Sequence, residues 1–299
     1  MSEIKSVAIA GASGDLGTTV VKALIDAKFQ VTVLTRSAKP GAFDASVKVI
    51  EVDYASVESL TAALQGIDGL VSTVGHSAIP SQTVLIDAAV AAGVKRFIPS
   101  EFGSVTTNPN LVAYPVYAEY HSIKQALQAK AEAGQMSWTI VRCGAFLEFV
   151  FDSPMALNWG EHKATLLDEG DNRFSSTSLL NIGKTVAGIF VNPEATKNRA
   201  MKVSQLILTQ NELLSIAQEV RTDIKWEVSK ASTSAILKAG LESARAGEHG
   251  IPTMMKILTG TSLAGDTYGA AYYETDNELF GIKELTKDDL KKRVAEKLA

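Results

Sequence analysis

The sequence predicts an α/β protein built on a doubly wound parallel sheet, with a smaller, mainly helical C-terminal lobe. In the first half of the chain, short β-branched runs alternate with helical patterns, which is the order of a parallel sheet joined by right-handed crossovers. Most of these runs are apolar throughout, as expected for strands that helices cover on both faces. After residue 144 the pattern becomes less regular and more helical.

Six strands and four helices are expected in the first half. The apolar runs predict strands at Ser6–Ala10, Gln30–Thr35, Val47–Val52, Gly69–Val74, Arg96–Pro99 and Trp138–Arg142. The patterns between them predict helices near Gly14–Ala27, Val57–Leu64, Gln82–Ala92 and Tyr117–Ala133.

The second half is expected to hold a few strands and more helices. Residues 163–179 predict two short strands around a Gly-Asp-Asn turn, and residues 200–208 (AMKVSQLIL) predict one further strand. Helices are expected at 181–192, Asn211–Val220, Ser232–Gly247 and Thr286–Leu298, the second of them capped by Thr209 with Glu212 completing a capping box. We expect a first domain at 1–153 and a smaller one at 154–299, with about 180–208 returning to the main sheet.

Composition and charge restrict the function classes. The chain has 299 residues, 46% of them apolar, with a net charge of −4, which gives no electrostatic reason to expect a nucleic-acid partner. One cysteine, Cys143, excludes an intramolecular disulfide. No apolar run has the length of a signal peptide or a membrane span, so a cytoplasmic protein without a membrane partner is expected.

A glycine-rich stretch, VAIAGASGDLG, runs from the first strand into the first helix. Backbone next to a pyrophosphate leaves no room for a Cβ, and a helix N-terminus supplies oriented N–H groups. The stretch therefore predicts a Rossmann-like dinucleotide site, the alternative being glycines that only form a tight turn. The residues expected at the cofactor are Gly11, Ala12, Ser13, Gly14, Asp15, Leu16 and Gly17.

The end of the second strand should decide the choice of cofactor. An NAD enzyme usually places a carboxylate there, whereas this chain has Arg36, with Lys39 nearby. A guanidinium can bind a 2′-phosphate through two hydrogen bonds. We predict NADP(H), the alternative being that Arg36 is a solvated surface residue.

The ends of the next two strands supply further cofactor candidates. Asp53 could accept a hydrogen bond from the adenine amino group or could simply form a turn. Thr73, Val74 and Gly75 end the fourth strand, at the crevice where such sheets hold ligands. His76 follows directly, and its ring could touch cofactor or substrate or could form a structural hydrogen bond, which is the slightly favoured role.

A tyrosine and a lysine on one helix are the catalytic candidates. Tyr120 and Lys124 are four residues apart, which places both side chains on one face of the helix. A phenol with its ordinary pKa near 10 is a poor proton donor at pH 7 unless a neighbouring cation stabilises the phenolate. Lys124 could supply that charge and also bind the nicotinamide ribose.

Several motifs resemble one known family in order and spacing. GASGDLG, STVGH, AGVKRFIPSEFG, Lys124 and SWTIVRCGAF are similar to segments of the NmrA-like and isoflavone-reductase-like proteins, which are atypical short-chain dehydrogenases. The likeness covers about Val7 to Val203. In the plant reductases of that family the lysine matching Lys124 is the proposed base or proton relay, and a tyrosine matching Tyr120 is generally absent. Two mechanisms therefore stay open, with tyrosine as the acid or lysine acting alone.

The resemblance, together with the Tyr120–Lys124 pair of this chain, implies an NADPH-dependent reductase in which tyrosine and lysine provide proton donation. Its substrate would be a small aromatic or polyketide-like molecule with a ketone, an ether or an activated double bond. The family also contains a fungal regulator that binds a nucleotide and modulates a transcription factor. The alternative is therefore a non-catalytic NAD(P)-binding redox sensor that regulates a protein partner.

Overall fold

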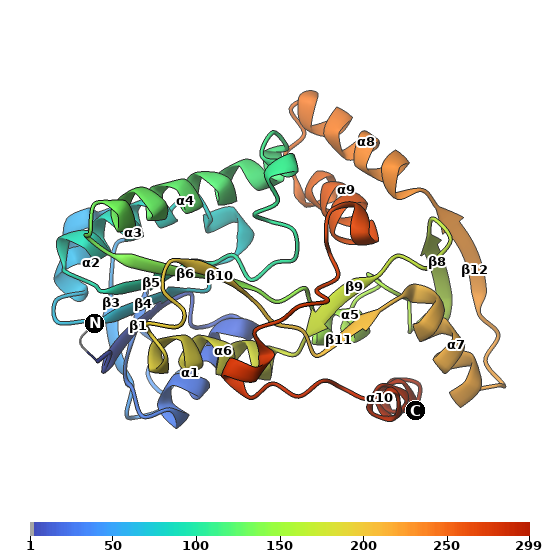
Figure 1. Cartoon of the computed structure of the whole chain (residues 1–299), viewed down its shortest axis with the longest axis horizontal. Helices are drawn as coiled ribbons and strands as arrows, with labels where there is room; N and C mark the ends of the chain where they lie inside the picture. Colours follow the sequence, from blue (N-terminus) through green and yellow to red (C-terminus); the bar gives the residue numbers. More distant parts are fainter. Residues whose placement is uncertain (1–2) are drawn as a thin grey trace. The chain divides into compact units, whose positions relative to one another are not determined.

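The computed structural model describes residues 3–299, and the chain divides into two compact units (Figure 1). The first unit comprises the chain up to Phe102 with Glu119–Arg142 and Leu179–Met201. The second comprises Gly103–Ala118, Cys143–Ser178 and Lys202–Ala299. The domain boundary expected after residue 153 stays a prediction.

The first unit is built on a seven-stranded sheet with the order β10-β6-β5-β4-β1-β2-β3. Strand β1 pairs in parallel with β2 on one side and with β4 on the other, and the pairs β2–β3, β4–β5 and β5–β6 are parallel as well. The strands are β1 (Ser6–Ala10), β2 (Gln30–Thr35), β3 (Lys48–Glu51), β4 (Gly69–Ser72), β5 (Arg96–Ile98), β6 (Ser137–Arg142) and β10 (Arg199–Lys202). This confirms the predicted Rossmann-like, doubly wound sheet. Its strand order reverses at β1 and β4, where such sheets form a crevice at the carboxyl ends.

Helices cover both faces of this sheet (Figure 1). On one face, α2 (Val57–Ala63), α3 (Gln82–Ala91) and α4 (Pro115–Glu132) bury apolar side chains against the strands in a single core cluster. On the other face, α1 (Asp15–Asp26) packs against α6 (Leu179–Val191). Gly69 of β4 permits close packing there, because a Cβ at this position would lie 2.6 Å from the ring of Phe190.

The second unit joins two small sheets to five α-helices. One sheet has the order β11-β9-β7, and in the other β12 pairs in parallel with β8. The strands are β7 (Ala145–Phe146), β8 (Lys163–Leu167), β9 (Phe174–Thr177), β11 (Leu206–Leu208) and β12 (Glu227–Ala231). The helices are α5 (Leu147–Asp152), α7 (Gln210–Val220), α8 (Thr233–Arg245), α9 (Ile251–Ser262) and α10 (Lys287–Lys297). Gly260 lets α9 approach α8, since a Cβ there would lie 2.5 Å from the Cβ of Leu237.

The prediction of one strand over residues 200–208 is wrong. The segment forms β10 and β11, which belong to different sheets. The break falls at Ser204, whose N–H donates to the side chain of Asn277 and whose carbonyl accepts from it. A residue more than seventy positions away therefore ends the ladder, and local sequence could not show this. Residues 163–179 do contain two strands, but β8 and β9 pair with other partners and not with each other.

Asp68 joins three segments at the amino end of β4. Its carboxylate accepts from the backbone N–H groups of Lys5 and Ser6, at 2.9 and 3.1 Å, and from Lys95 Nζ at 2.6 Å. Burial by itself raises the pKa of Asp68, but these bonds outweigh it and hold the pKa at about 2. The carboxylate therefore stabilises the fold above its ordinary pKa, and this contribution is lost as the pH falls from about 4 to about 2.

We expect Asp68→Asn to lower the free energy of unfolding at pH 7 by about 2 kcal/mol, with the difference vanishing near pH 2. Urea denaturation at several pH values measures it. Asp223→Asn is the matched control, because Arg221 holds the pKa of Asp223 at about 2 as well but this carboxylate is exposed, so its loss should matter little. Equal losses in the two variants, or a loss for Asp68→Asn that does not change with pH, would refute the assignment.

Candidate functional site

The glycine loop after β1 is built from three glycines with different roles. Gly11 has a φ of 84°, and a Cβ on it would lie 2.6 Å from the carbonyl carbon of Thr73. A Cβ on Gly17 would collide with the carbonyl oxygen of Gly11. A Cβ on Gly14 would have no protein atom closer than 3.9 Å. Gly11 and Gly17 are therefore required by the fold, whereas the space beside Gly14 is open.

The N-terminus of α1 has no capping side chain. Gly14 is the N-cap residue, with extended φ and ψ of −80° and 168°, and within the described part of the chain the helix has no side-chain cap hydrogen bond. Such N–H groups, together with the partial positive charge of a helix N-terminus, form a site for an anion. Of the other residues predicted here, Asp15 is exposed, Leu16 is buried, and neither lines the cleft beside the loop.

A cleft of about 630 Å³ lies beside this loop, within the first unit. Its volume falls in the range of small-molecule sites, roughly 300–1,000 Å³. Nine of the predicted cofactor residues line it: Gly11, Ala12, Ser13, Gly14, Arg36, Lys39, Thr73, Val74 and Gly75. The cleft thus joins the carboxyl ends of β1, β2 and β4, at the point where the strand order reverses.

The loop after β2 carries the two basic candidates and is held by a carboxylate. Arg36 and Lys39 are exposed and line the cleft. Glu51 Oε1, from the end of β3, accepts from the N–H of Ala38 at 2.6 Å. The sequence did not indicate an acidic residue beside the loop after β2, because Glu51 is distant along the chain. Its carboxylate fixes the loop and is not among the cleft residues.

Two aromatic side chains of the cleft were not predicted. Phe43 and Tyr54 line it beside the β2 loop. The hydroxyl of Tyr54 donates to the carbonyl of Leu34 at 2.9 Å, and burial raises the pKa of Tyr54 to about 12. Tyr54 is therefore a neutral wall residue at pH 7. Tyr54 directly follows Asp53 at the end of a strand next to β2, and this position could have identified it in the sequence as a residue of the cleft.

Asp53 lies outside the lining of the cleft. Its Oδ1 accepts from the N–H of Ala55 at 2.9 Å, which is the turn-forming arrangement that was the alternative for this residue. A bond from Asp53 to an adenine amino group stays a prediction.

Tyr120 and Lys124 lie on α4 beside the residues that pack against the sheet. Ile123 and Leu127 are buried in the core, and positions 120 and 124 flank them on the same helix face. Both side chains are half-buried. The Tyr120 hydroxyl lies 3.5 Å from Nδ1 of His76, the first residue of the short 3-10 helix η1 (His76–Ala78) that follows the fourth strand. Gly75, Ser77 and Ala78 around this histidine line the cleft, so the structure brings the tyrosine next to a cleft loop.

Ser100 has a structural role at the end of β5. Its hydroxyl donates to the carbonyl of Val74 at 2.7 Å, and its N–H donates to the side chain of Gln82 at 2.6 Å. Both bonds fix the loop that carries the cleft residues after β4.

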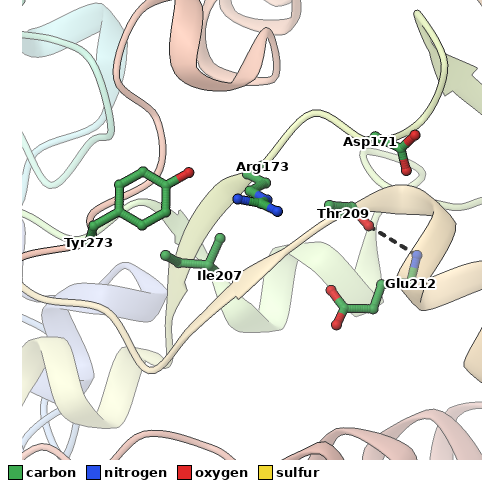
Figure 2. Close-up of a pocket in the computed structure, with 6 residues that line it drawn as sticks. All are labelled: Asp171, Arg173, Ile207, Thr209, Glu212 and Tyr273. Carbon is green, nitrogen blue, oxygen red and sulfur yellow. Dashed lines mark hydrogen bonds between the residues drawn. The ribbon is translucent and has the colours of Figure 1, made fainter.

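A second hollow, of about 510 Å³, lies within the second unit and contains none of the predicted site residues. Figure 2 shows Arg173 above Ile207, between Tyr273 and Thr209, with Asp171 and Glu212 at the other end. Thr209 caps α7 by accepting from the N–H of Glu212, as the sequence predicted. The charged side chains here are exposed and of both signs, so they do not define one kind of ligand.

Two features are absent from residues 3–299. No group of three or more histidine, cysteine, aspartate or glutamate side chains among them is arranged to hold a metal ion. None of the helices in this described part combines the length and the apolar character needed to cross a membrane.

The sheet order, the glycine loop and the cleft at the strand reversal define a Rossmann-like α/β protein. The chain belongs to the NmrA-like family, whose family model matches residues 3–258. This confirms the resemblance found in the sequence motifs.

Individual relatives support the same classification. The chain is 34% identical over 293 residues to the oxidoreductase aprR of Aspergillus flavus, covering 95% of this chain and 96% of the relative. It is 31% identical over 294 residues to the oxidoreductase poxI of Penicillium oxalicum, covering 95% and 92%. Leucoanthocyanidin reductase from Vitis vinifera, solved as a binary complex with NADPH, shares the fold with a TM-score of 0.75, 22% identity and coverage of 98% and 99%. The two fungal relatives support the classification of this chain as an oxidoreductase.

Proposed function

We propose that this protein is an NADPH-dependent reductase of a small, aromatic or polyketide-like molecule. The observation that carries the proposal is the cleft itself, in which an uncapped helix N-terminus and two basic side chains line one space. The solved reductase with NADPH bound and the fungal oxidoreductases of the family support the choice of cofactor and reaction.

The residues of the cleft fit such a cofactor. The open space beside Gly14 and the first-turn amides of α1 suit a pyrophosphate, which needs backbone donors and room for its oxygens. Arg36 and Lys39 suit the additional 2′-phosphate, because each carries a positive charge at the cleft. Phe43 and Tyr54 supply apolar walls at the same end. Val74 and Gly75 extend the lining along the loop after β4.

When bound, NADPH supplies a hydride to the substrate. The protein must supply the proton, since hydride addition leaves developing negative charge on the acceptor. We assign proton donation to Tyr120. Lys124 lies one helical turn later on the same face and stabilises the phenolate that proton loss creates. The half-buried position of both groups strengthens their interaction relative to one in open solvent.

Arg36→Ala should lower the affinity for NADPH about tenfold or more while leaving the affinity for NADH nearly unchanged, a difference of about 1.4 kcal/mol. The reason is that only NADPH carries the 2′-phosphate. Calorimetric titration of both cofactors measures the ratio. Lys48→Ala is the matched control, since Lys48 is an exposed cation at the opposite end of β3 and does not line the cleft. An unchanged NADPH-to-NADH ratio in Arg36→Ala would remove this residue from the site.

The activity is tested by following NADPH oxidation at its absorbance band with a panel of aromatic ketones, quinones and benzylic ethers. Turnover of at least one class supports the reductase. Tight binding of the cofactor without turnover of any class, together with a protein partner that co-purifies, would instead establish a redox sensor.

A further inference from the structure

A contact between His76 and Tyr120 adds a residue to the proton chemistry. Nδ1 of His76 lies 3.5 Å from the Tyr120 hydroxyl, and the two rings are 6.4 Å apart with a tilt of 32°. The distance is long for a hydrogen bond, but catalytic hydrogen bonds often tighten only when substrate is present. The contact joins two segments separated by more than forty residues, so it reflects the fold and not local sequence.

The position of His76 suits a link between Tyr120 and water. The histidine begins η1, directly after Gly75, and its residue is exposed to solvent, whereas Tyr120 is half-buried. Partial desolvation lowers the pKa of His76 and so favours the neutral ring. A neutral imidazole has one N–H donor and one acceptor nitrogen, so it can give a proton on one side and take one on the other.

We propose that His76 returns a proton to Tyr120 after each turnover. This inference rests on the proposed function and extends it. The O–H bond of Tyr120 breaks as the proton passes to the substrate, and the phenolate then takes the proton of His76 Nδ1. Nε2 of His76 accepts a proton from hydronium or a buffer acid in the solvent, so the ring ends neutral and each turnover consumes one solvent proton. The two tautomers re-equilibrate by exchange with solvent before the next cycle. His76 acts through Tyr120 and is therefore a positioning and relay residue.

The relay makes a kinetic prediction that a merely structural role does not. The first turnover uses the proton already on Tyr120, so His76→Ala should keep a first turnover close to that of wild type. Later turnovers should slow on the order of tenfold or more, because the phenolate must wait for another donor. Exogenous imidazole should restore them. His249→Ala, at an exposed histidine in the second unit, is the control and should behave as wild type.

His76→Asn separates relay from positioning, since an amide can bond the Tyr120 hydroxyl at the place of Nδ1 but cannot exchange protons in this way. The relay predicts slow later turnovers in this variant as well. A readout independent of activity is the 19F resonance of Tyr120 in protein labelled with 3-fluorotyrosine. The resonance is assigned to Tyr120 by its absence in the Tyr120→Phe variant. It should shift in His76→Ala and not in His249→Ala.

Three results would overturn the proposal. They are full multiple turnover in His76→Ala, restoration of turnover by His76→Asn, and an unchanged Tyr120 resonance in His76→Ala. Failure of the proposed function is seen separately, as absent turnover by wild type. A shifted resonance in such a protein would mean that the two rings interact without serving proton transfer, which also contradicts the relay.

Discussion

Lys124→Ala should lower turnover with NADPH by about 10²- to 10⁴-fold, the usual contribution of general acid catalysis. Lysine either donates the proton itself or stabilises the phenolate of Tyr120, so its loss removes proton donation under both mechanisms. Stopped-flow measurement of hydride transfer reports this directly. Cofactor affinity, measured by fluorescence titration, shows how much of the loss comes from binding to the nicotinamide ribose.

Tyr120→Phe divides the two mechanisms. A loss comparable to that of Lys124→Ala identifies tyrosine as the acid, and a loss of less than about tenfold means that lysine acts without it. Lys130→Ala is the matched control, because Lys130 lies on the same helix but forms an ion pair with Asp87 at 3.0 Å. Nearly full activity in Lys124→Ala would exclude this pair from the chemistry.

Gly14→Val should weaken NADPH binding by on the order of 100-fold or more while leaving the chain folded. The structure separates these two effects, because a Cβ at Gly14 meets no protein atom within 3.9 Å. The valine side chain would therefore occupy the space that we assign to the pyrophosphate and would not disturb the fold. Calorimetric titration with NADPH measures the loss, and circular dichroism verifies the fold.

Two further glycine variants complete this test. Gly17→Ala should destabilise the fold, since its Cβ would collide with the carbonyl oxygen of Gly11. Gly160→Val, in open space within the second unit, should leave both the fold and cofactor affinity unchanged. Normal NADPH binding by a folded Gly14→Val variant would contradict the assignment of the loop.

The main sheet could be predicted from sequence because its strands are marked locally. Strands β1 and β2 have the predicted bounds, and the other four differ by at most two residues at an end. Continuous apolar runs bounded by turns identify such strands when helices cover both faces. The glycine loop was predictable for a related reason, since a positive φ at Gly11 and a tight approach at Gly17 allow few other residues.

The second unit was less predictable because its signals are weak or distant. Strand β12 is exposed at four of its five residues and so has no apolar pattern. Helix α9 was not predicted at all. At the site, Phe43, Tyr54 and Glu51 come from segments that reach the cleft only through the folding of β2 against β3. The contact of His76 with Tyr120 likewise depends on the placement of α4 beside the loop after β4.

A crystal structure of the complex with NADP⁺ would locate every part of the bound cofactor. We expect the pyrophosphate at the amides beside Gly14, the 2′-phosphate against Arg36 and Lys39, and the nicotinamide end directed toward Tyr120 and Lys124. Cofactor density outside the cleft, or a 2′-phosphate that contacts neither basic side chain, would contradict this placement.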